Sequence, residues 1–267
     1  MTSDSAIATH GLSKRFGDIA AIEGVDFQVA PASIFGLLGP NGAGKSTTIK
    51  ILTTLLDATS GSATVAGFDV AEEPIEVRKR IGYVPQLLSA DGALTAAENL
   101  ELSARLYGLR GEQCKARIRE ALDLAGLVEV GDKLVRTYSG GMIRRLEIAQ
   151  ATLHTPQVLF LDEPTIGLDP VARRTVWDRL LELRRTHGMT ILITTHDMEE
   201  ADVLCDELAI LHQGHLAVTG RPAELKARLG PQATLDDVFA EASGAIMDLG
   251  GNYRDVRQSR AAIRRRG

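Results

Sequence analysis

The chain has 267 residues, of which 44% are hydrophobic and 24% charged, so its length suits one or two domains with a well-packed core. Its net charge of −5 argues against a protein that coats nucleic acid, and we expect no nucleic-acid partner. No stretch approaches the ~18 consecutive apolar residues of a membrane span, and residues 1–5 do not resemble a signal peptide, so we expect a cytoplasmic chain.

The first structural signals along the chain are β-strands. Between about Ala6 and Val29, apolar and polar residues alternate around glycines, which predicts short antiparallel strands. Residues 33–38 form an apolar run typical of a buried strand, and residues 46–52 have the apolar spacing of a helix.

The motif G-x-x-x-x-G-K-[ST] spans residues 39–46, between this strand and this helix. We expect the backbone N–H groups of this phosphate loop to bind a polyphosphate at the helix N-terminus. Lys45 would reach the β- and γ-phosphates of the nucleotide, and the Ser46 hydroxyl would ligate magnesium. The alternative, a glycine-rich turn with a chance lysine, is disfavoured by the flanking strand and helix. The predicted nucleotide-binding residues here are Gly39, Pro40, Asn41, Gly42, Ala43, Gly44, Lys45, Ser46 and Thr47.

Residues 95–127 change to a helical pattern that Gly108 and Gly111 interrupt. We interpret about residues 87–155 as a helical subdomain inserted between strands. Cys114, in this segment, and Cys205 are predicted to be free thiols, because two distant cysteines do not suggest a metal cluster or a disulfide in a reducing compartment.

Residues 138–142, Tyr-Ser-Gly-Gly-Met, precede a predicted helix from Ile143 to Leu153. Ser139, Gly140 and Gly141 would place unpaired N–H groups and the positive end of a helix dipole at its start. Alone, this pattern is more typical of a helix cap. Beside a nucleotide motif, it predicts a second phosphate-binding helix start, which would serve the γ-phosphate bound by another copy across a two-fold dimer.

Two adjacent carboxylates, Asp162 and Glu163, follow an apolar strand at residues 158–161. Ligands of open α/β sheets bind at the C-terminal ends of strands, and neighbouring strand residues point in opposite directions. We therefore predict that Asp162 orients magnesium and that Glu163 polarises the attacking water. A solvated loop start is the alternative, which the phosphate loop disfavours.

Strand patterns return at residues 190–194 and 208–211, with helical patterns between them, which favours a parallel α/β sheet. Residues 234–239 predict a short helix, and the order of the chain beyond Ser243 is expected to decline.

From about Ala6 to Gly230, the chain resembles the ATP-binding subunit of an ABC transporter. The resemblance rests on the order of the phosphate loop, Gln86, residues 138–142 (the signature segment), the strand that ends at Glu163, Gly167-Leu168-Asp169 and His196. It implies an α/β P-loop NTPase fold, with a RecA-like parallel sheet core, an antiparallel β layer and the inserted helical subdomain. Residues 1–230 would form the ATPase domain, and residues 231–267 a partly disordered C-terminal extension.

The resemblance also implies roles for residues outside the motifs above. Gln86 would contact magnesium or the attacking water and couple the site to a membrane partner, and His196 would bond the γ-phosphate. Asp169 would lie at the dimer seam, a role compatible with capping the helix that Pro170 begins. Phe16 stands where the family places an aromatic against adenine; a core phenylalanine is the alternative.

Two residues of the signature segment depart from the family pattern, with Tyr138 in place of leucine and Met142 in place of glutamine. Residues 138–146 and 234–239 resemble the daunorubicin-resistance-like subfamily of exporters. This resemblance favours export of a drug, lipid or polysaccharide. The arginines from Arg254 to Arg266 are predicted to form a solvated tail, or to contact anionic lipid headgroups.

The resulting hypothesis is an ATPase, peripheral on the inner face of the cell membrane, that closes as a homodimer or heterodimer on ATP and magnesium. It would drive a separately encoded integral membrane permease. The alternatives are a soluble ABC-type ATPase acting on ribosomes or DNA, a P-loop phosphotransferase, and a nucleotide switch that does not hydrolyse ATP. The signature segment and His196 disfavour the phosphotransferase, and Glu163 disfavours the switch.

Overall fold

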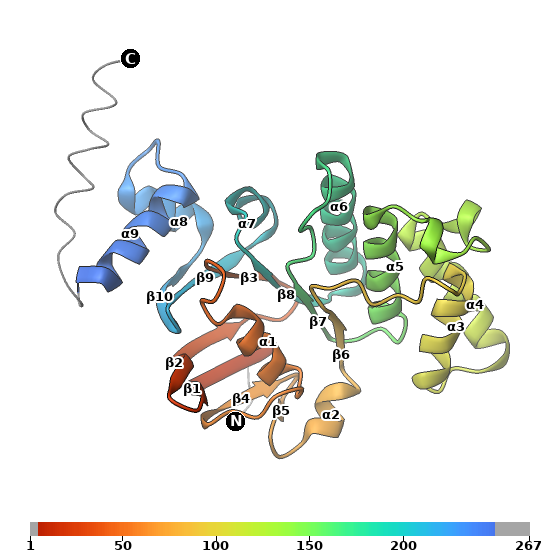
Figure 1. Ribbon diagram of the computed structural model, residues 1–267, viewed down its shortest axis with the longest axis horizontal. Coiled ribbons are helices and arrows are strands. Elements are labelled where there is room, and N and C mark those ends of the chain that lie inside the picture. The colour runs from red at the N-terminus through yellow and green to blue at the C-terminus, as the bar shows by residue number, and fades with distance from the viewer. Residues whose placement is uncertain (1–4, 249–267) are drawn as a thin grey trace.

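The computed structural model describes residues 5–248, and these residues form one sheet of six strands and another of four. The larger sheet has the order β10–β9–β3–β8–β7–β6 (Figure 1). In that order its strands are His215–Gly220, Glu207–His212, Ile34–Leu38, Thr190–Thr195, Val158–Asp162 and Ile81–Val84. Neighbouring strands are parallel except β10, which runs antiparallel to β9. Every residue of β3, β7 and β8 is buried, which explains their nearly continuous apolar sequences.

The smaller sheet is antiparallel, with the strand order β2–β1–β4–β5. In that order its strands are Ile19–Val29, Ile7–Phe16, Ser60–Val65 and Phe68–Asp69. With 10 residues in β1 and 11 in β2, these strands differ from the short ones that the glycines predict. Register shifts between Thr9 and Leu12 absorb extra residues as bulges, so the strands bend without ending.

Helix α1 (Lys45–Leu52) lies between the two sheets, and the short α2 (Pro74–Arg78) follows β5 (Figure 1). A continuous cluster of buried side chains joins both sheets to α1. Phe27 of β2 stacks on Phe35 of β3 with ring centroids 5.2 Å apart, and Ile49 and Leu52 of α1 are fully buried. This packing fixes where α1 begins, at the end of the phosphate loop.

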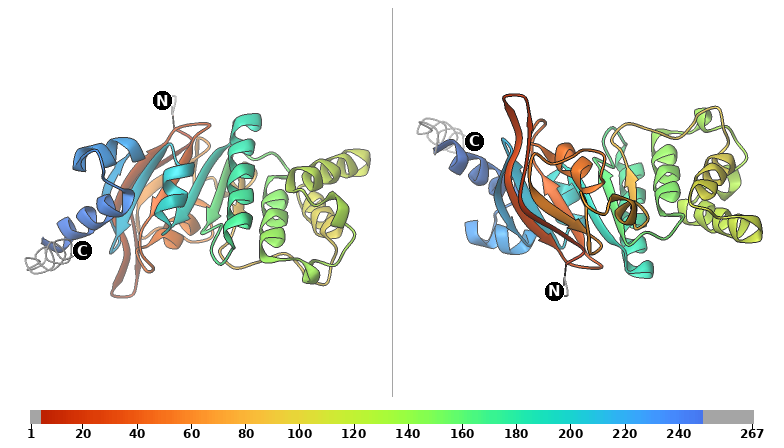
Figure 2. Two further views of the ribbon diagram at one scale, coloured as in Figure 1. Left: turned by 90° about the horizontal axis from the view of Figure 1, so that it is seen from above. Right: turned by 90° about the horizontal axis from the view of Figure 1, so that it is seen from below.

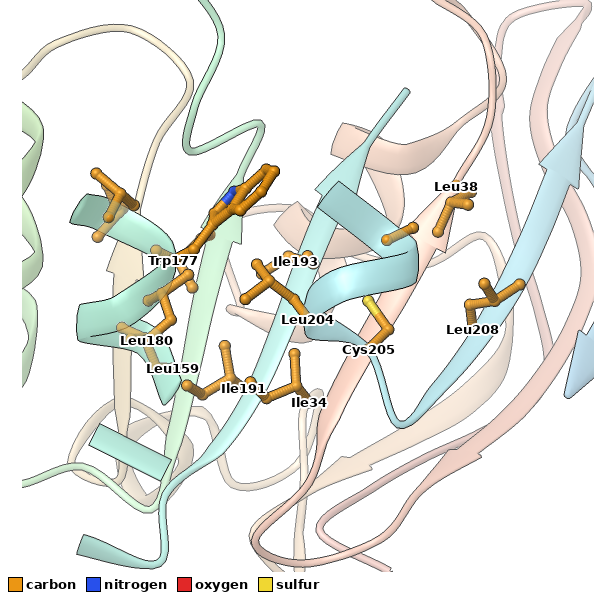
Figure 3. Close-up of a cluster of buried hydrophobic side chains, with 14 of the residues drawn as sticks. Ile34, Leu38, Leu159, Trp177, Leu180, Ile191, Ile193, Leu204, Cys205 and Leu208 are labelled. Atoms are coloured by element: carbon orange, nitrogen blue, oxygen red, sulfur yellow. The ribbon is translucent and has the colours of Figure 1, made fainter. Parts of the chain in front are cut away.

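Helices α6 (Pro170–His187) and α7 (Met198–Leu204) cover the opposite face of the larger sheet. Figure 3 shows the strand residues Leu159, Ile191 and Ile193 facing helix residues. Trp177 and Leu180 of α6 and Leu204 of α7 complete this cluster, and all three are buried. The sheet is therefore covered on both faces, as a parallel sheet requires.

Helices α3 (Ala96–Leu106), α4 (Gly111–Ala125) and α5 (Gly140–Thr152) form a separate bundle with its own core. The predicted break at Gly108 and Gly111 separates α3 from α4. Single turns of 3-10 helix, Val128–Val130 and Val135–Thr137, lead into α5. Figure 2 shows this bundle at one end of the molecule and the C-terminal helices at the other. The two sheets and the inserted bundle confirm the predicted fold class.

The last described helices are α8 (Pro222–Leu229) and α9 (Leu235–Asp248). Helix α9 is longer than the short helix predicted for residues 234–239, because Leu235, Val238 and Ala242 continue an apolar stripe that is buried against the main core. The predicted domain boundary at residue 230 stays a prediction. The arginine-rich tail lies outside the described residues. Within residues 5–248 we find no helix with the length and apolar character that crossing a bilayer requires.

Candidate active site

The phosphate loop joins β3 to α1 at the C-terminal edge of the parallel strands. Gly44 precedes α1 with a φ of 108°, and a Cβ at this position would collide with the Ile22 side chain and the Ala21 carbonyl. Gly42 has a φ of 82°, which L side chains rarely adopt. These two glycines let the chain turn tightly into α1, whose first N–H groups lack helical partners and suit an anion.

Lys45 holds its ammonium group over this loop. Its Nζ donates hydrogen bonds to the carbonyl oxygens of Gly39 at 2.8 Å and Pro40 at 3.2 Å. It also lies 3.2 Å from Glu163 Oε1, and the Lys45 residue is only 5% exposed. A shielded cation at the helix start is suited to a polyphosphate, because low solvent exposure strengthens its attraction for anionic oxygens.

Asp162, the last residue of β7, lies beside the start of α1. Its Oδ1 accepts hydrogen bonds from the Ser46 hydroxyl at 3.1 Å and from the Thr194 hydroxyl at 2.5 Å. The parallel register pairs Asp162 with Thr194 on β8, so the two strand ends fix the carboxylate. The geometry brings together two of the three predicted magnesium ligands, Ser46 and Asp162, whereas the side chain of the third, Gln86, bonds Glu163.

Glu163 is the point where several predicted residues meet. Its carboxylate lies 3.2 Å from Lys45 Nζ, accepts a hydrogen bond from Gln86 Nε2 at 3.3 Å, and lies 3.4 Å from His196 Nδ1. The Glu163 backbone has a φ of 49°, an uncommon conformation for a side-chain-bearing residue. Its amide donates to Thr194 Oγ1 and to the Thr194 carbonyl oxygen, which holds this conformation in place. Strained residues of this kind concentrate at functional sites.

The donor set at this edge fits magnesium. The Ser46 hydroxyl and the Asp162 carboxylate are hard oxygen ligands within hydrogen-bonding distance of each other, next to the phosphate loop. Magnesium commonly takes one or two protein oxygens and completes its shell with phosphate and water oxygens. In residues 5–248 no cluster of three histidine, cysteine or acidic side chains offers an all-protein metal site. The same edge could thus bind a nucleotide together with its metal.

The signature segment lies in another part of the molecule. Ser139 precedes α5 as its N-cap, and its hydroxyl accepts a hydrogen bond from the Met142 amide at 3.3 Å. Ser139 and Gly140 are exposed, whereas Gly141 is buried. Figures 1 and 2 show α5 separated from α1 by β7 and α6. Among the contacts of the described residues, none joins Ser139 to the phosphate loop of its own chain.

The departure at Tyr138 has a structural explanation. Tyr138 is buried in the core of the α3–α5 bundle, and its hydroxyl donates a hydrogen bond to the Val130 carbonyl oxygen at 2.6 Å. Met142 packs against the same core. Both side chains therefore face the bundle, and the serine and glycines between them form the exposed start of α5.

Phe16 and Asp169 lie at the surface. Phe16 is 51% exposed, so the alternative prediction, a core phenylalanine, is wrong. Lys14 Nζ lies 5.3 Å from the centroid of its ring. Asp169 caps α6 by accepting hydrogen bonds from the amides of Val171 at 2.9 Å and Ala172 at 3.0 Å. The predicted cap is thus present, and the exposed ring of Phe16 is accessible to a base.

Two supports of this site were not predicted from the sequence. Thr194 fixes both carboxylate residues, but its role depends on the order of the strands, which the sequence does not reveal. Glu200 of α7 is 1% exposed, and its Oε1 accepts hydrogen bonds from Thr165 Oγ1 at 2.7 Å and Trp177 Nε1 at 2.9 Å. Burial raises the pKa of Glu200. This carboxyl group ties the segment after Glu163 to the helices behind it.

Comparison with known proteins places this geometry in a family. The family model described as ABC transporter matches residues 22–166. The chain is similar to the daunorubicin/doxorubicin resistance ATP-binding protein DrrA of Streptomyces peucetius, with 46% identity over 84% of this chain and 68% of the relative. It is also similar to the linearmycin resistance ATP-binding protein LnrL of Bacillus subtilis, with 39% identity over 84% of this chain and 72% of the relative.

Solved structures agree with the sequence relatives. An ATP-binding subunit of an ABC transporter superposes with a TM-score of 0.80 and 30% identity, over 90% of this chain and all of that one. A dimeric ATP-binding cassette in a post-hydrolysis state with ADP and Pi matches with a TM-score of 0.73 and 26% identity, over 80% of this chain and 98% of that one. The predicted resemblance is confirmed: the chain belongs to the ABC transporter family, as an ATP-binding subunit that hydrolyses ATP.

Proposed function

We propose that the chain powers an exporter, with Glu163 as the residue that polarises the attacking water. The observation that carries this proposal is the convergence of Lys45, Gln86 and His196 on the Glu163 carboxylate, all within 3.4 Å. These side chains come from the phosphate loop, from the segment after β6 and from the residue that follows β8. A carboxylate held at the edge of a phosphate site is well placed to accept a proton from water.

The remaining residues would divide the binding of ATP. Lys45 and the N–H groups of residues 39–47 would offset the charge of the phosphates. Ser46 and Asp162 would hold magnesium, which supplies neutralisation of charge on the phosphate oxygens when bound. Gln86 would orient the water, and His196 would contact the terminal phosphate. Phe16 would stack on the adenine.

A second copy would complete the site. The exposed start of α5 would offer Ser139 and Gly140 to a phosphate outside its own chain, and Asp169, which is also exposed, would lie at the same seam. The similarity to a dimeric cassette with ADP and Pi supports a paired arrangement. We propose that ATP binding favours the closed homodimer or heterodimer, and that loss of the γ-phosphate releases it.

Export is supported by the relatives, which are named resistance ATP-binding proteins for daunorubicin, doxorubicin and linearmycin. A separate integral membrane permease would carry a drug, lipid or polysaccharide, and this chain would bind it from the cytoplasmic face of the membrane. These relatives disfavour the alternative of an ATPase acting on ribosomes or DNA. Release of phosphate from ATP with no acceptor present would separate this function from a phosphotransferase.

The Glu163→Gln variant tests the proposal. It keeps the shape of the side chain but removes the base, so we expect ATP binding like that of the wild type and turnover slower by about 10²–10⁴. An ATP-dependent dimer should accumulate, measured by size-exclusion chromatography. The control is Glu112→Gln on α4, where the native side chain is 83% exposed. Wild-type turnover in Glu163→Gln would remove Glu163 from this role.

A further inference from the structure

A buried ion pair on α5 has no part in the function proposed above. Arg144 and Glu147 are each no more than 3% exposed, and Arg144 Nη1 lies 3.0 Å from Glu147 Oε2. They are three residues apart, on the helix that begins just after Ser139. Burying two charges is costly unless further hydrogen bonds satisfy them, so their remaining partners reveal what the pair holds.

Those partners all lie in residues 85–90, the Gln86 loop. Arg144 donates from Nη1 to the Pro85 carbonyl oxygen at 2.7 Å and from Nη2 to the Gln86 carbonyl oxygen at 2.8 Å. Glu147 Oε1 accepts hydrogen bonds from the amide and the hydroxyl of Ser89, the latter at 3.1 Å, and from the Ala90 amide at 3.3 Å. The pair therefore holds both ends of the loop by hydrogen bonds, Arg144 at residues 85–86 and Glu147 at residues 89–90.

The Gln86 loop begins directly after β6, which ends at Val84, and leads toward α3, which begins at Ala96; most of its residues are exposed. The side-chain amide of Gln86 reaches Glu163, while its backbone carbonyl is held by Arg144. A continuous series of hydrogen bonds thus runs from α5 through Gln86 to the catalytic carboxylate.

We propose that Arg144 and Glu147 are positioning residues that join the Gln86 loop to α5 as one unit. Any displacement of the α5 start at Ser139 is then transmitted to Gln86, and through it to Glu163. This inference rests on the proposed role of Glu163 and adds a regulatory link to it: the position of the signature segment sets whether Gln86 is aligned for hydrolysis.

The test is the double variant Arg144→Met/Glu147→Leu, which removes both buried charges together and so leaves neither one unpaired. We expect it to fold, with the affinity for ATP unchanged and kcat reduced on the order of tenfold or more, as for the loss of charged hydrogen bonds. In a Gln86→Ala background, the same double change should cause no further loss, because its effect passes through Gln86. A full additional loss in that background would overturn the proposal.

Arg145→Met is the matched control. Arg145 is a neighbouring arginine whose Nη1 donates to the Ala125 carbonyl oxygen at 2.6 Å, inside the helical bundle and away from the Gln86 loop. Any effect of this change on kcat should persist in the Gln86→Ala background. Arg144→Lys keeps the charge but cannot donate two hydrogen bonds in the fixed geometry of a guanidinium. This milder variant should show a smaller loss of kcat.

Hydrogen exchange separates this inference from the proposed function. In the double variant the amides of Ser89 and Ala90 should exchange at least about tenfold faster than in the wild type, whether or not ATP is hydrolysed. Unchanged exchange in a folded double variant would refute the proposed link between α5 and the Gln86 loop, even if the wild type is an active ATPase. Absence of wild-type hydrolysis alongside faster exchange would instead refute the role of Glu163.

Discussion

Packing of the signature segment against α6 leads to a sharp prediction about two adjacent glycines. A Cβ added at Gly141 would lie 2.7 Å from the Cβ of Ala172, closer than such atoms approach in folded proteins. A Cβ added at Gly140 would lie 3.5 Å from Leu168 Cδ2, an ordinary contact. Both changes to alanine gain similar helix propensity, so the difference between them isolates the cost of overpacking, about 1–3 kcal/mol.

Urea unfolding of Gly141→Ala and Gly140→Ala measures this difference directly. We expect Gly141→Ala to be the less stable by about 1–3 kcal/mol, with the same dependence on urea concentration in both. Adding Ala172→Gly to Gly141→Ala should recover part of the loss, since it removes the other half of the clash. Equal stabilities for the two single variants would refute the proposed contact between α5 and α6.

Three further predictions concern Glu200, Phe16 and Ser46. Because the pKa of Glu200 is raised in the folded protein, its contribution to stability is complete below pH 4.5 and is lost as the pH rises through the folded pKa. Glu200→Gln should therefore flatten the decline of the unfolding free energy as the pH rises above 4.5. Urea unfolding at a series of pH values measures this decline, and an equal decline in the variant and the wild type would contradict the prediction. Phe16→Ala should weaken binding of a fluorescent ATP analogue by on the order of 1–3 kcal/mol, by analogy with base stacking, while Phe16→Tyr retains it. Ser46→Ala should raise the magnesium concentration that gives half-maximal hydrolysis; an identical magnesium titration would exclude Ser46 as a ligand.

The sequence alone predicts those parts of the site whose pattern lies within a short segment. The phosphate loop combines a short motif with a flanking strand and helix, so the placement of Lys45 and Ser46 at the start of α1 could be predicted. Asp162 and Glu163 were also predictable, because an apolar strand marks the edge at which its following residues lie.

Features that depend on contacts between distant segments could not be predicted from one sequence. Thr194 supports Asp162 only because β8 lies next to β7 in matching register, and strand order has no local signal. Arg144 and Glu147 look like the charges of an exposed helix face until the Gln86 loop is placed against them. The bulges that let β1 and β2 continue past their glycines likewise depend on their pairing.

Disulfide trapping between two copies tests the central claim, that ATP is held between the phosphate loop of one chain and the signature segment of another. Thiols introduced by Asn41→Cys and Ser139→Cys on separate Glu163→Gln chains, with Cys114 and Cys205 replaced by alanine, would report their proximity. We predict rapid cross-linking of the mixed chains with ATP and magnesium and little without nucleotide. Cross-linking that is absent with ATP, or equal in its presence and absence, would contradict the shared site.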